Sequence, residues 1–286
     1  MHLPVVTKNS AAVEAAVQSA YQSCFPQGDA QFVARVFGWA SDCFTGRNLN
    51  YQPIDAPYHD YEHTLQGTLC MARLLHGRHS AGAVPQISEH LFQLGIIAIL
   101  LHDTGYLKKR GDTVGTGAKY TVTHVTRSTE FSAEFLRQKG FGLCDIKAVQ
   151  NLICCTGVDS VLSSICFQSA EEKIVGHALG TADLLGQMAA DDYVEKLPVL
   201  YREFAEAANF SHDNKSFVSM FSSAHDLEEK TAGFWLKYVR PKLERDFDGL
   251  YHFLNDPYPG GPNFYVEHVE ANISRLQKQV ALAAKS

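Results

Sequence analysis

Strand signals, disulfide motifs and stripes of positive charge are all scarce in this chain of 286 residues. Alternating β-branched runs between turns are hard to find, which argues against a sheet. The 7 cysteines include no CxxC motif, and their odd number in so long a chain favours reduced thiols in a cytoplasm over a disulfide framework. The net charge of −6 comes without a basic stripe, so we expect no nucleic-acid partner.

Long apolar stretches are missing as well. The most apolar run, 91–101, is about half of the roughly 20 residues that a membrane span needs. The first residues, MHLPVVTKNS, lack the basic and apolar regions of a signal peptide. We therefore expect a cytoplasmic protein without a membrane partner, while no pattern in the chain sets an oligomeric state.

Helical periodicity is what the chain has in abundance. Its 45% hydrophobic and 20% charged residues are enough for a sizeable core. Ser88 is a candidate N-cap, Gly140 a candidate helix stop, and Pro198 a candidate bend. We expect a mobile loop at the glycine-containing segment 110–120. The prediction is one all-α domain spanning 1–286, with helices near 10–24, 29–46, 60–76, 88–103, 123–139, 146–155, 171–190, 191–210, 214–246 and 263–283.

Two histidines four residues apart open one of these helices, in the segment PYHDYEHT. His59 and His63 project from nearly the same helical face. Neutral imidazole is the commonest metal ligand in proteins, so both could bind one ion, or one could bind while the other transfers protons. The spacing by itself fits capping or surface histidines equally well.

A His-Asp doublet and a single aspartate complete a candidate set. His102 and Asp103 end a strongly apolar run, where a carboxylate is disfavoured by burial and by the helix dipole unless a cation is near. Asp183 shares a helical face with Gly176 and Gly180, which would let another helix approach closely, although a hydrogen bond to the backbone would also explain it. His63, His102, Asp103 and Asp183 together form an imidazole–carboxylate set suited to Mn, Fe, Zn, Mg or Ni.

The order His … His-Asp … Asp on a helical chain resembles the HD-domain superfamily of metal-dependent phosphohydrolases. The segment YHDYEHT also resembles the Tyr-His-Asn-x-x-His segment of the helical cyclic-nucleotide phosphodiesterases, with Asp60 in place of the Asn. The resemblance covers about 55–190 and implies an HD-like helical bundle there, with extra N- and C-terminal helices. It also implies that His63, His102, Asp103 and Asp183 ligate a divalent ion and that His59 protonates the leaving oxygen.

The function implied by the resemblance is hydrolysis of a small-molecule phosphate ester, of a nucleotide or a related compound, by metal-activated water. Asp103 would ligate the ion and orient the nucleophile, and His59 would act as general acid. His124 is a candidate second-metal or phosphate ligand, with helix capping as the alternative. The remaining candidates are loop cations that would neutralise phosphate charge or form an ordinary solvated patch: Lys108, Lys109, Arg110, Lys119 and Arg127.

Three other functions fit parts of the pattern. A zincin protease shares the two-histidine spacing, but its motif requires Glu directly after the first histidine, where this chain has Asp60. An HD-fold di-iron oxygenase would use a similar pocket with more ligands. A non-catalytic metal- or nucleotide-binding regulatory module needs the ligands but not the proton donor His59.

Overall fold

The computed structural model describes residues 5–48, 50–158, 160–210 and 217–283 and confirms an all-α protein. Within these residues there is no β-strand, only two isolated bridges, Tyr51–Lys109 and Asn255–Asn263. The α-helices are α1 (Ser10–Cys24), α2 (Phe32–Phe44), α3 (Tyr61–Ser80), α4 (Glu89–Leu101), α5 (His124–Gln138), α6 (Leu143–Ile153), α7 (Ala170–Met188), α8 (Tyr193–Phe210), α9 (Ala224–Phe234) and α10 (Phe264–Ala283).

Short helices of other types join them. The 3₁₀-helices are η1 (Thr104–Tyr106), η2 (Gly117–Tyr120), η3 (Leu162–Ser164), η4 (Phe217–Met220) and η7 (Leu250–Leu254), and the π-helices are η5 (Trp235–Val239) and η6 (Lys242–Asp246).

Side-chain caps set several helix starts. The Ser88 hydroxyl accepts a hydrogen bond from the Leu91 N–H, as its place before α4 predicted. Asp60 caps α3 in the same way, because its carboxylate accepts from the His63 N–H at 2.8 Å. Gly140 adopts φ of +85° directly after α5, the left-handed conformation that ends helices.

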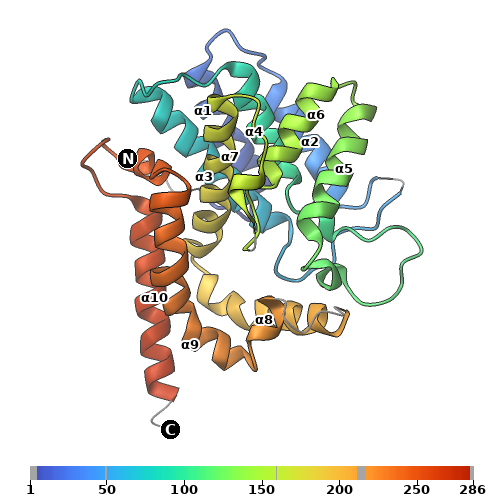
Figure 1. Ribbon diagram of the computed structural model, residues 1–286, viewed down its shortest axis with the longest axis vertical. Helices are drawn as coiled ribbons and strands as arrows, with labels where there is room; N and C mark the ends of the chain where they lie inside the picture. Colours follow the sequence, from blue (N-terminus) through green and yellow to red (C-terminus); the bar gives the residue numbers. More distant parts are fainter. Residues whose placement is uncertain (1–4, 49, 159, 211–216, 284–286) are drawn as a thin grey trace.

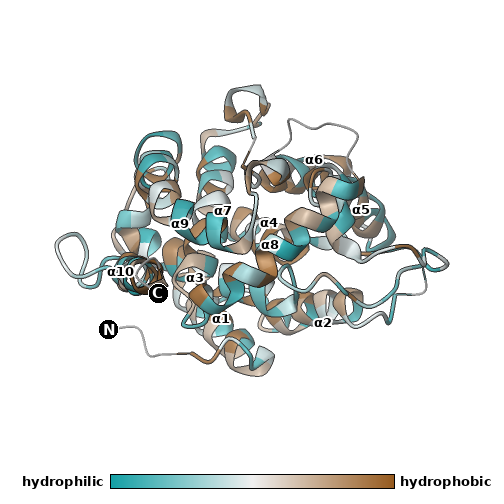
Figure 2. Cartoon of the chain, turned by 90° about the horizontal axis from the view of Figure 1, so that it is seen from below, coloured by the Kyte–Doolittle hydropathy of each residue, from teal (hydrophilic) through white to brown (hydrophobic). Residues whose placement is uncertain are grey.

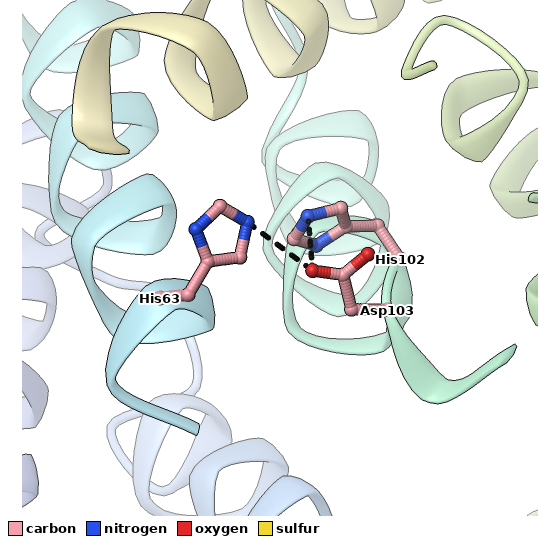
Figure 3. Close-up of side chains that lie close together, drawn as sticks. All are labelled: His63, His102 and Asp103. Atoms are coloured by element: carbon pink, nitrogen blue, oxygen red, sulfur yellow. Dashed lines mark ion pairs between the residues drawn. The ribbon is translucent and has the colours of Figure 1, made fainter. Parts of the chain in front are cut away.

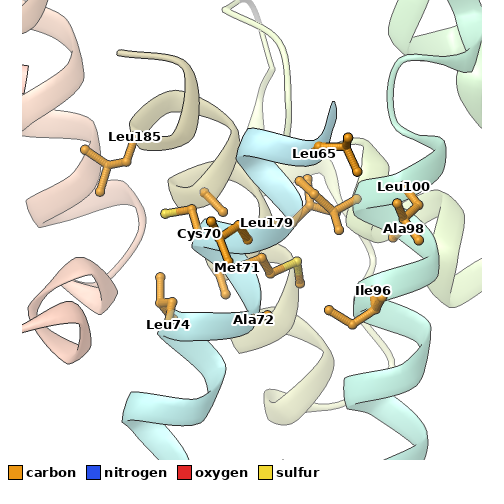
Figure 4. Packing of buried hydrophobic residues seen from close by; sticks show 14 of the residues in the cluster. Leu65, Cys70, Met71, Ala72, Leu74, Ile96, Ala98, Leu100, Leu179 and Leu185 are labelled. Atoms are coloured by element: carbon orange, nitrogen blue, oxygen red, sulfur yellow. The ribbon is translucent and has the colours of Figure 1, made fainter. Parts of the chain in front are cut away.

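Three helices form the centre of the molecule. α3 packs most extensively on α7 and also contacts α1 and α4 (Figure 1). The apolar side chains between α3, α4 and α7 are almost completely buried, as Figure 4 shows for Met71, Ile96 and Leu179. The helices in Figure 2 carry both hydrophilic and hydrophobic turns, as expected of helices that bury one side. One connected cluster of buried residues extends from Val13 on α1 to Leu276 on α10.

The close contact between α3 and α7 occurs at a different glycine from those expected. A Cβ on Gly186 would lie 2.8 Å from the backbone of Gln66 and Gly67 on α3. Gly176 and Gly180, which we expected to admit a neighbouring helix, face Cys155 just after α6 and the rings of Phe167 and Phe247, and a Cβ on Gly180 would lie 2.8 Å from the Cys155 carbonyl oxygen. Gly186 is therefore the residue that lets the two helices approach, one turn beyond Asp183.

The C-terminal third differs in detail from the sequence prediction. α8 runs without interruption through Pro198, which does not mark its boundary. The single helix expected over 214–246 consists of η4, α9 and the two π-helices, with 214–216 outside the described residues. In Figure 1, α8 and α9 lie below the bundle formed by α1–α7, and the long α10 runs down its lower left side.

The segment 110–120 is tied down by hydrogen bonds. Asp55 accepts from the Gly117 N–H at 2.7 Å, and Glu206 on α8 accepts from the Thr116 hydroxyl at 2.7 Å. The Gln52 amide donates to the carbonyl of Asp112 at 2.7 Å. The loop expected to be mobile is thus fastened to both neighbouring segments.

Among the described residues, none of the helices has the combination of length and apolar character needed to cross a bilayer.

Candidate metal centre

Three elements bring the candidate ligands together. His63 lies in the first turn of α3, where the Asp60 cap fixes its backbone. His102 is the C-cap of α4, and Asp103 follows it directly. Asp183 comes from α7, which packs against α3.

The functional atoms of these four side chains meet at one point. Figure 3 shows His63, His102 and Asp103 turned toward one another. The Asp103 Oδ2 atom lies 3.2 Å from the Nε2 atoms of both His63 and His102. The Asp183 Oδ1 atom lies 3.3 Å from His63 Nε2 and 3.4 Å from His102 Nε2. The structure therefore brings together all four residues that the sequence predicted as ligands.

The four nitrogen–oxygen separations fit adjacent ligands of one divalent ion, and the ligand atoms of His63, His102 and Asp103 all lie within 4.8 Å of one another. An ion held at about 2.1 Å keeps tetrahedral neighbours about 3.4 Å apart and octahedral neighbours about 3.0 Å apart. The Nε2 atom of His102 and the Oδ2 atom of Asp103 are buried and have no hydrogen-bond partner, although they are within hydrogen-bond distance of each other. Unpartnered buried polar atoms are rare in proteins, and a shared cation would satisfy both.

A backbone contact orients one imidazole for this role. His102 Nδ1 lies 2.7 Å from the carbonyl oxygen of Ile99, to which it donates. In the neutral imidazole the other ring nitrogen, Nε2, then carries no proton and faces the two carboxylates, the usual arrangement of a ligating histidine. The Nδ1 atom of His63 is buried and has no such partner among the described residues.

The two buried carboxylates of the cluster also need positive charge beside them. Burial lowers the pKa of His63, but the adjacent carboxylates of Asp103 and Asp183 outweigh it and raise the pKa to about 10. Burial likewise opposes the charge on both aspartates, yet the two histidines hold the pKa values of Asp103 and Asp183 below the ordinary range. Two buried carboxylates thus require two positive charges, which either two imidazolium protons or one divalent ion can supply.

His124 stands on the other side of Asp103. Its Nε2 atom is 3.9 Å from Asp103 Oδ1, and its Nδ1 donates to the Thr121 carbonyl at 2.6 Å. Burial lowers the pKa of His124, which favours the neutral form that binds metals. Gly105 makes this approach possible, because a Cβ there would lie 2.0 Å from the His124 carbonyl oxygen.

His59 is held by a carboxylate that sequence reasoning missed. Its Nδ1 atom lies 2.6 Å from Oε2 of Glu203, and Glu203 Oε1 accepts from the Tyr58 N–H at 2.7 Å. The imidazole also stacks on Tyr106, with ring centroids 4.4 Å apart. Glu203 is 1% exposed and lies on α8, outside the segment covered by the resemblance.

A signal for Glu203 exists in the sequence. The apolar stripe of α8 includes Leu197, Leu200, Phe204 and Ala207, and Glu203 lies on it, three residues from Leu200 and four from Ala207. An acidic residue on the buried face of a helix requires a partner.

The basic residues expected to contact phosphate are engaged elsewhere. The Lys108 ammonium is 2.7 Å from both the Gly115 carbonyl and a carboxylate oxygen of Asp55. Arg127 donates to the carbonyls of Gly105 and Leu107 at 2.7 and 2.9 Å. Lys119 bonds Asp112 and Val114 within the 110–120 segment, Arg110 bonds the Gly46 carbonyl, and Lys109 is exposed. Among the described residues that line the cavity at the site, none is one of these five cations.

The ligand cluster forms one end of a cavity of about 340 Å³. His59, His63, Asp103, His124 and Asp183 line that end. Most of the remaining wall comes from α7, α8, α9, η4 and the π-helices, with further residues from η1, α5 and the segment after α6. A small molecule that occupied the cavity would therefore touch both the candidate metal ligands and His59.

Comparison with known proteins places the chain in one family. Residues 110–253, just over half of the 286, match the profile of the Npun_R2479-like family, so the chain belongs to that family. The matched segment contains His124, Asp183 and Glu203, whereas His59 and His63 precede it. A search of curated proteins finds no match.

Proposed function

We propose that this protein is a metal-dependent phosphoric ester hydrolase of the HD-domain type. The observation that carries the proposal is the convergence at the cavity of two imidazole Nε2 atoms and two carboxylate oxygens, with each nitrogen 3.2–3.4 Å from both oxygens. The His59–Glu203 pair beside them supplies a proton donor, which a module that only binds its ligand would not need. A divalent ion at an open cavity and a nearby proton donor are the two parts that ester hydrolysis requires.

His63, His102, Asp103 and Asp183 would hold the ion. Once bound, it would lower the pKa of a water molecule and polarise a phosphoryl oxygen. Asp103 Oδ1, the oxygen that faces His124, can accept a hydrogen bond from the attacking water. Because Glu203 accepts the proton on His59 Nδ1, the Nε2 atom is the one that delivers a proton to the leaving oxygen.

A test of this assignment compares leaving groups. The Mn²⁺-loaded protein should hydrolyse both bis(p-nitrophenyl) phosphate and an alkyl phosphate ester. His59→Asn should lower the rate on the alkyl ester by about 10²–10⁴-fold, because an alkoxide must be protonated as it leaves. The loss on the p-nitrophenyl ester should be much smaller, since p-nitrophenolate leaves without a proton.

The matched control is His90→Asn, which removes an exposed imidazole paired with Asp145 and should leave both rates unchanged. Absence of any metal-dependent hydrolysis, or equal rates of wild type and His59→Asn on the alkyl ester, would refute the proposal.

One observation keeps a di-iron oxygenase as the second candidate. Both oxygens of Asp103 face histidines, Oδ2 toward His63 and His102 and Oδ1 toward His124, as a carboxylate bridging two ions would. Two iron ions per chain together with substrate-dependent oxygen consumption would favour the oxygenase. Hydrolysis without oxygen consumption favours the hydrolase.

A further inference from the structure

The cavity wall remote from the ligand cluster is strongly apolar. It is formed by side chains of α8, η4, α9 and η5, among them Leu197, Phe204, Phe221, Leu227 and Phe234. Phe204 and Phe221 stack with ring centroids 5.7 Å apart. Such a surface gains free energy from contact with apolar groups in proportion to the area removed from water.

Polar side chains on this wall direct their hydrogen bonds into the protein. The Thr231 hydroxyl donates to the Leu227 carbonyl at 2.7 Å, and the Tyr238 hydroxyl donates to the Val158 carbonyl at 2.7 Å. The Lys230 ammonium lies 2.8 Å from Asp226. Recognition of a nucleobase edge requires donors and acceptors that face the ligand, and both hydroxyl protons and the Lys230 ammonium are already bonded within the protein.

Gln187, which lies between the ligand cluster and the apolar wall, is committed at both ends of its amide. Its Oε1 accepts from the Tyr58 hydroxyl at 3.0 Å, and its Nε2 donates to the Asp183 carbonyl at 3.1 Å. The amide therefore uses one donor and its oxygen to support α7 next to a candidate metal ligand.

A buried lysine, Lys242, also lines the cavity but is kept in the wall. It is 7% exposed, and its ammonium lies 3.7 Å from Asp246. The same ammonium lies 5.2 Å from the ring centroid of Phe247 and 5.5 Å from that of Tyr238. The two aromatic faces and the carboxylate compensate its charge, and its aliphatic stem adds to the apolar surface.

We propose that the cavity selects organic phosphates whose alcohol is apolar, an alkyl or aryl group, rather than nucleotides. The phosphate head would lie at the candidate metal ligands and the apolar body against α8 and α9. The inference rests on the proposed hydrolysis only for the identity of the head group. The charged candidate metal ligands would face the phosphate, and the apolar wall would face the apolar group.

The test measures binding of n-alkylphosphonates, whose C–P bond is not hydrolysed. Methyl-, butyl- and octylphosphonate are titrated calorimetrically into the Mn²⁺-loaded protein, with AMP as the nucleotide probe. Affinity should rise about three- to fourfold per methylene until the chain fills the cavity. Octylphosphonate should bind at least 100-fold more tightly than methylphosphonate and at least tenfold more tightly than AMP.

Two variants locate the apolar contact. Phe234→Ala removes a half-buried ring from the cavity lining and should weaken octylphosphonate at least fivefold without changing methylphosphonate. Leu227→Trp fills part of the cavity and should reduce the dependence on chain length. Leu236→Ala is the control, because Leu236 is 54% exposed and is not among the lining residues, and it should bind every phosphonate as the wild type does.

The outcomes separate this inference from the proposed hydrolysis. Equal affinity from methyl to octyl, a chain-length effect unchanged in Phe234→Ala and Leu227→Trp, or tighter binding of AMP overturns the inference even if small esters are hydrolysed. Chain-length-dependent binding that both variants reduce supports it even if no ester is turned over, in which case only the hydrolysis fails.

Discussion

Asp103 lies between the His63–His102 pair and His124 in the candidate site. Its side chain is 2% exposed, and its Oδ2 atom has no hydrogen-bond partner although two imidazoles lie 3.2 Å away. Its other oxygen faces His124. A carboxylate buried in this way is costly unless a cation compensates it. We therefore expect removal of its charge to weaken metal binding.

Asp103→Asn keeps the size of the side chain and removes the charge. We expect the affinity for Mn²⁺ to fall by more than about 100-fold, beyond the 10–100-fold typical of residues that only support a ligand. Metal content after dialysis and a titration with Mn²⁺ measure the effect. Asp42→Asn, at an exposed carboxylate paired with Arg47, is the control and should bind metal normally. Full metal retention by Asp103→Asn would remove this residue from the ligand set.

At this scale the sequence predicted which candidate ligands would lie together better than it predicted the residues that support them. His63, His102, Asp103 and Asp183 carry chemistry that is visible in their type and position, and the structure brings them together. The partner of His59 was not predicted, because Glu203 is 144 residues away and only the folded chain makes them neighbours. The partners of the loop cations were not predicted either, because positive charge beside a motif does not say which carbonyl or carboxylate it will meet.

The contact between α3 and α7 is the element-scale feature that sets the geometry of the site. His63 and Asp183 come from these two helices, and their backbones approach most closely near Gly67 and Gly186. A side chain at Gly186 would force the helices apart, since the atoms it meets belong to the backbone and cannot rotate away.

Gly186→Ala should therefore destabilise the protein by about 1–3 kcal/mol. It should also weaken Mn²⁺ binding, because it separates two ligands. Gly38→Ala on α2 is the matched control, since a Cβ there meets nothing within 4 Å. That variant should be stabilised by up to about 1 kcal/mol through helix propensity. Denaturant unfolding measures both, and equal stabilities of the two variants would contradict the packing argument.

Element positions were largely predictable because apolar periodicity and capping residues act locally. The helix predicted over 10–24 coincides with α1, and the Ser88 cap and Gly140 stop are where the sequence placed them. The glycine that admits α3 was not identified, because the residue that faces a neighbouring backbone depends on how two distant helices cross. The π-helical turns after α9 have no signal in simple periodicity.

For the whole molecule, a bound ion would link the three central helices. α3, the end of α4 and α7 each supply at least one candidate ligand, so an ion that binds only the folded state stabilises all three together. Stability should then depend on metal concentration.

Mn²⁺ at 100 times its Kd should add about 2.7 kcal/mol to the free energy of unfolding. In thermal melts, this gain should appear as an increase of several degrees in Tm over the EDTA-treated protein. Asp183→Asn should lose the increase, whereas Asp191→Asn, at a carboxylate 97% exposed, should keep it. A Tm independent of metal in the wild type would show that no ion couples these helices.

Anomalous diffraction from crystals grown with Mn²⁺ tests the central claim most directly. The account predicts one strong peak about 2.0–2.3 Å from His63 Nε2, His102 Nε2 and the facing oxygens of Asp103 and Asp183. Crystals that show well-ordered side chains at these four residues and no peak between them, at saturating Mn²⁺, would contradict it.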